Sequence, residues 1–363
     1  MKSSIAHVLV GTALGVLLLS GCGGTSSGSS PTASASPTAS PQDLSGFALY
    51  AAGDRAYSST DGGATWHASR GAHGLFWGVA ASDRDHAWIA GNGGQILSTV
   101  DGGRSWVRQR VPGGEQELGA ITCLDAWHVF AAGTAQKGAF VLSSRNGGRT
   151  WRSSPLLEVP HSLNAIACSD KRHVWAAGSP SGAGSSPAVP GAVIASSDGG
   201  ATWRVQHSDA EASYRGITFS DQRHGWVVGA SRDAQAIILR TTDGGASWSE
   251  QTFPEANLLS AVTCSDARHV WAVGGAQYGS RATVLATDDG GQTWHAQDLG
   301  PFSDGEIHFS ATGVTCSDAK HVWVVGTTQH DGVVLASRDG GSSWTVQASR
   351  PLSAILNGIA YAP

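Results

Sequence analysis

One short string recurs seven times in this chain and sets what the chain can fold into. The string is Asp-Gly-Gly-x-Ser/Thr-Trp, with Asn replacing Asp in the third copy. Successive copies begin 40, 45, 52, 45, 46 and 50 residues apart, so the period is about 46 residues. A regular period of this length predicts an array of like units. The copies begin at Asp61, Asp101, Asn146, Asp198, Asp243, Asp289 and Asp339.

The residues of the string suit a tight hairpin turn. Two adjacent glycines supply positive φ angles, and the Asp carboxylate can accept backbone N–H bonds. The Trp anchors the turn on the sheet. The side-chain carbonyl of Asn146 can accept the same bonds, so we expect an intact turn there as well. We therefore interpret the string as structural, together with its tryptophans, Trp66, Trp106, Trp151, Trp203, Trp248, Trp294 and Trp344.

Two further segments precede each string. One ends in glycine, as in 271–274, and the other lies before it, as in 261–264. Each unit thus contains four short runs rich in β-branched or aromatic residues, separated by Gly, Asp and Ser, which is typical of a four-stranded antiparallel sheet. No stretch shows a convincing helical period. Four strands in about 46 residues match a β-propeller blade.

The two ends of the repeat region complement each other. The first unit starts at 47–53 and lacks its first strand, while 355–361 after the last string has the form of that strand. A C-terminal strand that completes the first blade would close the ring and leave no unpaired edge. We predict an all-β fold, a seven-bladed β-propeller of four-stranded antiparallel blades over residues 47–363.

The N-terminal segment differs in composition from the repeats. The apolar run within residues 1–21 is too short to span a bilayer and predicts a signal peptide. Its end, Leu-Ser-Gly followed by Cys22, resembles the lipobox of bacterial lipoproteins, which implies a lipidated Cys22. The alternative is an ordinary secretory signal before an unrelated Cys. Residues 22–46, rich in Gly, Ser, Thr, Ala and Pro, are expected to be a flexible tether. These features predict an extracytoplasmic protein anchored to a bacterial membrane through its lipid only.

The string is identified as the Asp-box, or BNR repeat, which occurs in sialidases, sortilin-type receptors and non-enzymatic propellers. The Asp-box therefore specifies fold better than function. The longer unit Cys264–Gly274, CSDARHVWAVG, followed by its Asp-box, resembles the repeat of the photosystem II assembly and stability factor family. This resemblance covers 47–361 and implies a seven-bladed scaffold that binds a membrane-protein partner. Nothing in the sequence itself indicates photosynthesis.

Repeated histidines and cysteines do not predict a metal site. Six histidines share one repeat position, each three residues after an Asp, and equivalent positions in a ring cannot converge on one ion. We expect a His–Asp hydrogen bond in each turn, and no metal or cofactor. Four cysteines share the end of the first strand, in what we interpret as a buried slot. Disulfides between neighbouring blades, Cys123 with Cys168 and Cys264 with Cys316, are the alternative. The histidines are His86, His128, His173, His224, His269 and His321.

The sequence argues against several functions. Its formal net charge of −5 predicts no nucleic-acid partner. No Arg-Ile-Pro precedes the first Asp-box, and neither paired carboxylates nor a nucleophile motif occurs at a repeat position, so we expect no enzyme. The alternative is a carbohydrate-active or glycan-binding propeller, such as a sialidase-like glycosidase, because sialidases share the Asp-box and Trp and Tyr can stack on sugars.

Two sets of residues are candidates for partner binding. A cation precedes the repeat His in four successive units, which predicts a positive arc for an acidic partner, or else a merely solvated arc. Aromatic residues on the opposite face are candidate anchors, or else caps of the core. The leading hypothesis is a lipid-anchored scaffold or assembly factor for a membrane or envelope protein complex. The candidates are Arg172, Arg223, Arg268 and Lys320 in the arc, and Trp77, Tyr278, Phe302 and Phe309 opposite.

Overall fold

The computed structural model describes the repeat region of the chain. The predicted signal peptide, Cys22 and nearly all of the predicted tether lie outside the described residues. Among these residues, no helix has the length and apolarity needed to cross a membrane. The described residues are 44, 46–113, 116–136, 138–155, 157, 161–181, 189–254, 256–275, 282–302, 308–348, 352 and 355–363.

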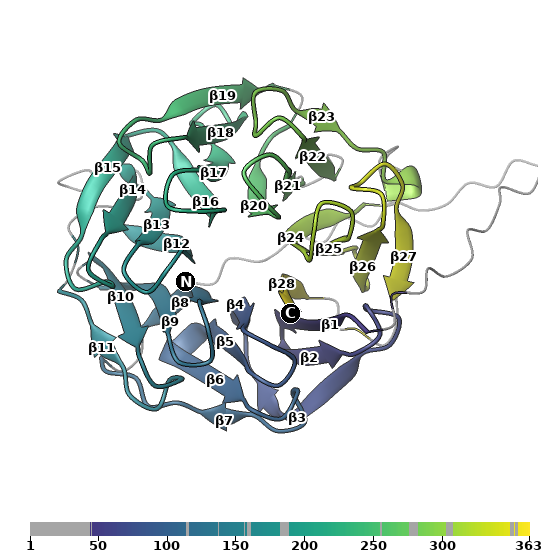
Figure 1. The fold of residues 1–363 in the computed structure, drawn as a ribbon, viewed down its shortest axis with the longest axis horizontal. Coiled ribbons are helices and arrows are strands. Elements are labelled where there is room, and N and C mark those ends of the chain that lie inside the picture. Colours follow the sequence, from purple (N-terminus) through teal and green to yellow (C-terminus); the bar gives the residue numbers. More distant parts are fainter. Residues whose placement is uncertain are drawn as a thin grey trace, which may run out of the picture. The chain divides into compact units, whose positions relative to one another are not determined.

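Seven four-stranded antiparallel sheets form a ring of blades around one channel (Figure 1). This arrangement confirms the predicted seven-bladed β-propeller. We number the blades in the order of their Asp-boxes and give each blade's strands from the channel outward. Blade 1 contains β28 (Leu356–Ala362), β1 (Ala48–Gly53), β2 (Arg55–Ser59) and β3 (His67–His73). Blade 2 contains β4 (Phe76–Ala81), β5 (Ala87–Gly91), β6 (Gln95–Thr99) and β7 (Val107–Arg108). Blade 3 contains β8 (Glu117–Cys123), β9 (Val129–Ala135), β10 (Gly138–Ser144) and β11 (Arg152–Ser153).

The remaining four blades repeat the same order. Blade 4 contains β12 (Ser162–Cys168), β13 (Val174–Ser179), β14 (Gly191–Ser196) and β15 (Arg204–Asp209). Blade 5 contains β16 (Ser213–Phe219), β17 (Gly225–Ala230), β18 (Ala236–Thr241) and β19 (Ser249–Phe253). Blade 6 contains β20 (Leu259–Cys264), β21 (Val270–Gly274), β22 (Thr283–Thr287) and β23 (His295–Ala296). Blade 7 contains β24 (Ser310–Cys316), β25 (Val322–Thr327), β26 (Gly332–Ser337) and β27 (Thr345–Ala348). Two 3₁₀ turns, η1 (Asn92–Gly94) and η2 (Gly300–Phe302), lie in loops.

The last strand closes the ring. β28 pairs antiparallel with β1, so that Tyr361 lies opposite Leu49 and Ile359 opposite Ala51. Blade 1 therefore takes its innermost strand from the C-terminus and the other three from the start of the repeat region. This pairing confirms the predicted closure, because β1 now lies between β28 and β2 and has no open edge.

Each Asp-box forms a hairpin turn between the third and fourth strands of its blade. In blade 5, Asp243 Oδ1 accepts the backbone N–H of Ser247 at 2.9 Å, and Oδ2 accepts the Ser247 hydroxyl at 2.6 Å. The glycines after Asp243 have φ angles of 76° and 89°, which L side chains rarely adopt. Asn146 accepts the equivalent backbone N–H, from Thr150, at 2.9 Å. The turn geometry therefore does not depend on the negative charge.

A repeated hydrogen bond joins neighbouring blades. The indole N–H of the second-strand Trp donates to the carbonyl of the first Asp-box glycine of the next blade, and these indoles are almost completely buried. In blade 1, the Tyr50 hydroxyl instead donates to the carbonyl of Arg84 at 2.7 Å. Blade 3 has Phe130 at this position, which has no polar atom to donate. The bonds are Trp88 to Gly147 at 3.1 Å, Trp175 to Gly244 at 3.3 Å, Trp226 to Gly290 at 3.0 Å, Trp271 to Gly340 at 2.8 Å and Trp323 to Gly62 at 2.9 Å.

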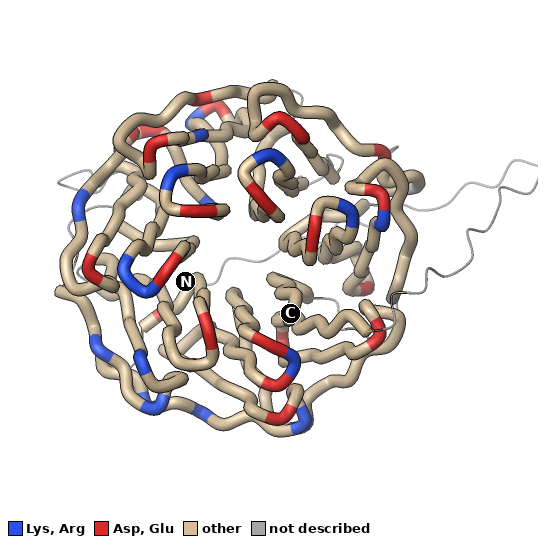
Figure 2. Tube along the Cα trace, in the orientation of Figure 1, with Lys and Arg blue, Asp and Glu red and all other residues tan. Residues whose placement is uncertain are grey.

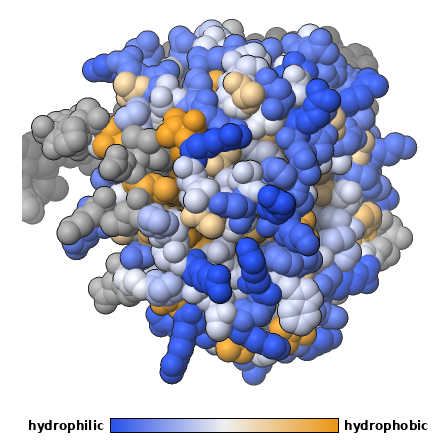
Figure 3. Space-filling model, turned by 60° about the vertical axis from the view of Figure 1, so that its left-hand side comes forward, coloured by the Kyte–Doolittle hydropathy of each residue, from blue (hydrophilic) through white to orange (hydrophobic). Residues whose placement is uncertain are grey.

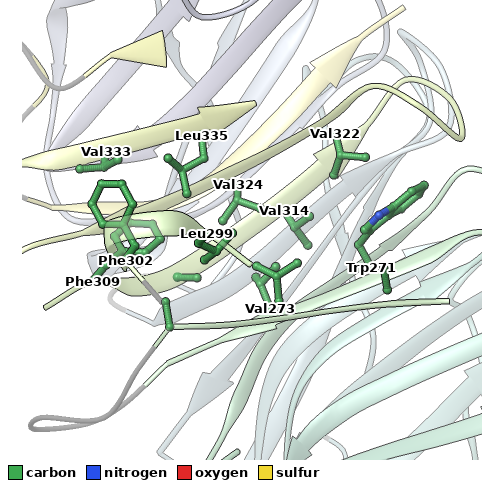
Figure 4. Packing of buried hydrophobic residues seen from close by; sticks show 14 residues of the cluster. Trp271, Val273, Leu299, Phe302, Phe309, Val314, Val322, Val324, Val333 and Leu335 are labelled. Atoms are coloured by element: carbon green, nitrogen blue, oxygen red, sulfur yellow. The ribbon is translucent and has the colours of Figure 1, made fainter. Parts of the chain in front are cut away.

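Apolar clusters fill the spaces between blades. Between blades 6 and 7, Val273, Val314 and Leu335 pack with two phenylalanines (Figure 4). Phe302 is only 7% exposed and Phe309 only 3%, and their ring centroids are 5.1 Å apart. These two rings are therefore part of the core, which was the alternative to a role as surface anchors.

The bond from Trp323 to Gly62 crosses the closing seam, and we predict that Trp323→Phe weakens it. The variant should lower the free energy of unfolding by about 1–2 kcal/mol, because it loses a buried hydrogen bond and some packing volume. Chemical denaturation measures the change. Trp127→Phe is the control, because Trp127 is exposed and should change stability by less than about 0.5 kcal/mol. Equal effects of the two substitutions would contradict the role of the bond.

Candidate functional site

Two kinds of turn form one face of the ring, which we call the turn face. It contains the turns between the first and second strands and the Asp-box turns. In blades 4, 5 and 6 the N–H of the first Asp-box glycine donates to the carbonyl of the residue before the repeat His, at 2.9 Å each time. The two turns of a blade are therefore joined, and a side chain on one is positioned by the other. These bonds are Gly199 to Arg172, Gly244 to Arg223 and Gly290 to Arg268.

The six repeat histidines stabilise these turns. In blade 6, Asp266 accepts hydrogen bonds from the backbone N–H of Arg268 at 2.7 Å and from Nδ1 of His269 at 2.9 Å. Burial acts to raise the pKa of Asp266, but these bonds and the backbone N–H of His269 outweigh it and lower the pKa to about 2. The carboxylate is therefore ionised and its oxygens are engaged within the turn. Within the described ranges, no three His, Cys, Asp or Glu side chains are grouped to hold a metal ion.

Three arginines of the predicted arc are held by the backbone. Nε of Arg172, Arg223 and Arg268 donates to the carbonyl of the residue just before the box Asp of the same blade, at 3.3, 3.4 and 3.0 Å. This bond orients the guanidinium of each arginine, and all three residues are exposed. Lys320 continues the arc in blade 7. In Figure 2 the first turns of blades 4 to 7 each show acidic and basic segments side by side around the channel.

The arc has charges that its own blades do not neutralise. In the part of the chain that the structure describes, no carboxylate forms an ion pair with these four cations. The carboxylates of the aspartates in the same turns instead accept hydrogen bonds from backbone and imidazole N–H groups. The cations are therefore the donors that remain available on this arc for a ligand.

Sequence reasoning missed an apolar patch beside the arc. In blade 3 the arc position is Trp127, which is 55% exposed, and Leu124 in the same turn is 39% exposed. Blade 3 neighbours blade 4, which begins the arc with Arg172. The patch could have been found by aligning the first turns of all blades, because Trp127 takes the place of a repeated Arg.

A second site lies in the channel, a cavity of about 660 Å³ lined by the innermost strand of every blade. Each of these strands carries a β-bulge near its start, where one residue is left out of the pairing with the second strand. The seven bulged residues, which we call the bulge ring, line the cavity. They are Trp77, Gly119, Asn164, Arg215, Ser260, Thr312 and Asn357.

The bulge ring combines polar side chains that are bonded within the protein with one exposed cation and one exposed aromatic ring. Asn164 and Asn357 donate to the backbone of the next blade, to Tyr214 at 2.7 Å and to Phe76 at 2.8 Å. Arg215 is exposed and has no ion pair in the described chain. Trp77 is 41% exposed, and its indole N–H is fixed by Asn92 Oδ1 at 2.8 Å. Trp77 is thus the predicted aromatic that remains accessible, whereas Tyr278 lies outside the described residues.

The four described cysteines are unpaired. Cys264 Sγ lies 3.4 Å from the hydroxyl of Thr218 in blade 5, and Cys316 Sγ lies 3.7 Å from that of Thr263 in blade 6. Burial raises the pKa of Cys264 to about 11 and that of Cys316 to about 12. The thiols are therefore protonated at neutral pH, which makes them poor nucleophiles and poor metal ligands. They fill the slot between first strands, and the alternative of disulfide pairing is not realised here.

A closed ring of seven Asp-box blades defines the class of this chain, an Asp-box β-propeller. Within that class it resembles the photosystem II assembly factors. The model of the family described as photosynthesis system II assembly factor YCF48 matches residues 195–274 and 253–359, together somewhat less than half of the chain. No curated protein matches the sequence at a significant level.

Solved structures show the same fold. YCF48 bound to a D1 peptide is 18% identical with a TM-score of 0.55, over 75% of this chain and 80% of that one. YCF48 from Cyanidioschyzon merolae is 16% identical with a TM-score of 0.56, over 77% and 86%. An ancestral GH74 enzyme is 18% identical with a TM-score of 0.59, over 87% of this chain and only 46% of its own. The match to the enzyme thus covers about half of its length.

The aspartates of the first turns predict an acid-sensitive stability. Their pKa in the folded protein lies below the ordinary value of 3.8, so they contribute stability above that value and lose it as the pH falls. We expect the free energy of unfolding to fall between about pH 4 and pH 2, and Asp266→Asn to make the fall shallower. The difference should be about 1 kcal/mol or less, because half of the Asp266 side chain is exposed and water screens the interaction. Urea denaturation at several pH values measures it, and equal slopes would contradict the assignment.

Proposed function

We propose that this protein is a non-catalytic propeller that binds a membrane or envelope protein complex as a scaffold or assembly factor. The observation that carries the proposal is the arc of unpaired cations on the turn face, three of which are held by backbone carbonyls. The family match and the fold support a protein-binding or assembly role. The solved YCF48 structure with a D1 peptide supports it further, because that relative binds a peptide.

The arc suits an acidic, extended segment of a partner. Arg172, Arg223 and Arg268 are repeat-equivalent and held in the same way, so little side-chain entropy is lost when they pair with carboxylates. Trp127 and Leu124 provide an apolar contact at one end of the arc. Aromatic residues and Arg are the residue types that most often dominate binding energy at interfaces. The partner is therefore expected to carry an acidic stretch with an apolar residue at one end.

The N-terminal features supply the location in this proposal. A lipid on Cys22 would anchor the protein to a bacterial membrane outside the cytoplasm. A flexible tether of roughly 20 residues has a root-mean-square reach of about 25 Å. A propeller held at that distance would meet membrane-protein loops at high effective concentration.

Charge reversal tests the role of the arc. Reversing Arg172, Arg223, Arg268 and Lys320 to Glu should abolish capture of the native partner by the tagged protein from solubilised membranes. In the unsubstituted protein, capture should weaken as the salt concentration rises, because exposed charges are screened. Cross-linking followed by affinity purification measures the enrichment of one complex.

Matched controls separate the arc from general charge effects. Reversing four exposed arginines on or near the outer strands, Arg70, Arg108, Arg110 and Arg204, changes the net charge equally and should leave capture intact. Cys22→Ala tests the anchor and should reduce capture without changing the fold. Unchanged capture by the arc variant would overturn the proposal, as would equal loss in the outer-strand control.

A second function, glycan binding, is favoured by the bulge ring. Trp77 offers an aromatic face, Arg215 a free cation, and the other bulged residues several amide and hydroxyl groups, which together suit an acidic sugar. The shared fold of GH74 enzymes is consistent with this alternative. Among the described residues that line the channel, Glu117 is the one carboxylate, so the feature that favours this alternative is sugar binding.

Binding of uronic-acid oligosaccharides tests this second function. Trp77→Ala and Arg215→Gln should each weaken binding about tenfold, because each removes a stacking or charged contact. Titration calorimetry measures the affinity, and Trp127→Ala on the turn face is the control. If the unsubstituted protein binds no such sugar, or if Trp127→Ala has the same effect, glycan binding in the channel is refuted.

A further inference from the structure

The seam between blades 3 and 4 departs from the repeat. At the other seams a Trp or Tyr donates a hydrogen bond to the next blade, whereas Phe130 at this seam packs near Gly200 without a polar link. The Asp-box of blade 3, whose first glycine accepts the Trp88 bond at the seam between blades 2 and 3, has Asn146 in place of Asp. Two exceptions to the seven-fold pattern, Phe130 and Asn146, thus belong to blade 3.

A groove of about 340 Å³ lies at this seam. The Asp-box hairpin of blade 3 lines it with Arg145, Asn146, Thr150 and Arg152, and blade 4 lines it with Gly199 and its neighbours. A Cβ placed on Gly199 would lie 3.4 Å from Nη2 of Arg145, so that guanidinium reaches across the seam to the backbone of blade 4. This side of the ring comes forward in Figure 3, where its surface is mainly hydrophilic.

The groove carries positive charge without a counter-charge of its own. Among the described residues, no Asp or Glu lines it, although the protein as a whole has a net charge of −5. Arg145 and Arg152 are exposed and form no ion pair with any described residue. Blade 3 alone has Arg both before the first box residue and after the box Trp, and Arg149 lies within the same box.

Asn146 also changes what Thr150 can donate. In the other boxes the equivalent hydroxyl, such as that of Ser247, donates its proton to the Asp carboxylate. In blade 3, Asn146 Oδ1 accepts the backbone N–H of Thr150, so its Nδ2 faces Thr150 Oγ1 and donates to it at 2.8 Å. The Thr150 hydroxyl is thereby an acceptor within the turn, and its proton is available to a group in the groove.

We propose that this groove is a binding site for a phosphate group. Arg145, Arg152 and the Thr150 hydroxyl present donors toward one polar cavity, and guanidinium groups match the oxygens of phosphate in pairs. A doubly charged tetrahedral anion gains more from two cations than a single carboxylate does. The phosphate can belong to a lipid headgroup or to a soluble phosphate compound. None of the four arc cations lines the groove, although Gly199 on its wall donates its N–H to the carbonyl of Arg172.

Asn146→Asp tests the site with little risk to the fold, because the six other boxes have Asp at this position. The substitution adds a negative charge and returns the hydroxyl proton of Thr150 to the turn. Pyrophosphate binding to the full chain, measured by titration calorimetry at low salt, should weaken about tenfold. The double variant Arg145→Gln/Arg152→Gln should weaken it at least as much.

Arg204→Gln is the matched control, because Arg204 is exposed and holds in blade 4 the position that Arg152 holds in blade 3. It should leave pyrophosphate affinity unchanged, and thermal melting should show that all variants fold. No pyrophosphate binding by the unsubstituted chain, or equal weakening by Arg204→Gln, would overturn the proposal.

Vesicles distinguish the source of the phosphate. All proteins in the vesicle experiment carry Cys22→Ala, so that their N-terminal segments contribute equally to vesicle binding. If Asn146→Asp lowers binding to phosphatidylglycerol vesicles as well as to pyrophosphate, a lipid headgroup can enter the groove. If it lowers pyrophosphate binding alone, the site takes a soluble phosphate compound. Either result supports the phosphate site.

Discussion

The hydrogen bond between a second-strand indole and the next blade's Asp-box is the interaction on which this ring depends. Trp323, for example, reaches from blade 7 to the carbonyl of Gly62 in blade 1. The bond needs the acceptor carbonyl at a fixed position, and the Asp or Asn side chain and the two glycines of the box hold it there. The same box turn holds the first turn of its blade and hence the arc. Fold and candidate site thus share one piece of local chemistry.

The fold could be predicted from the repeat, because a string that recurs about every 46 residues indicates both the four-stranded blade and a ring of such blades. The His–Asp hydrogen bonds could be predicted for the same reason, because the same Asp and His recur, three residues apart, in six blades. Features that break the pattern were harder to see. The bulge ring depends on strand register, which periodicity does not report, and so Arg215 and its neighbours were missed. Phe302 and Phe309 looked like loop aromatics, but they fold back into the core between blades 6 and 7.

The arc arises from a repeated position, whereas the other features proposed for binding arise where the repeat varies. Trp127 replaces an arc cation, the bulge ring holds six residue types at one position, and blade 3 carries the neutral amide of Asn146 where the other boxes carry a carboxylate. A rigid scaffold tolerates such changes because the hydrogen bonds that hold the turns are kept. Asn146 shows this directly, since it retains the turn bond to the backbone of Thr150 while removing a charge.

The pairing of β28 with β1 also orders the events of synthesis. β1 is the first strand of the propeller to leave the ribosome, and its partner is the last. Until residues 356–362 emerge, blade 1 has an open inner edge that can pair with the wrong strand. A product that stops short of β28 leaves the inner edge of β1 unpaired, and an unpaired strand edge promotes aggregation. The pairing of β28 with β1 can therefore form only after all seven blades have been synthesised.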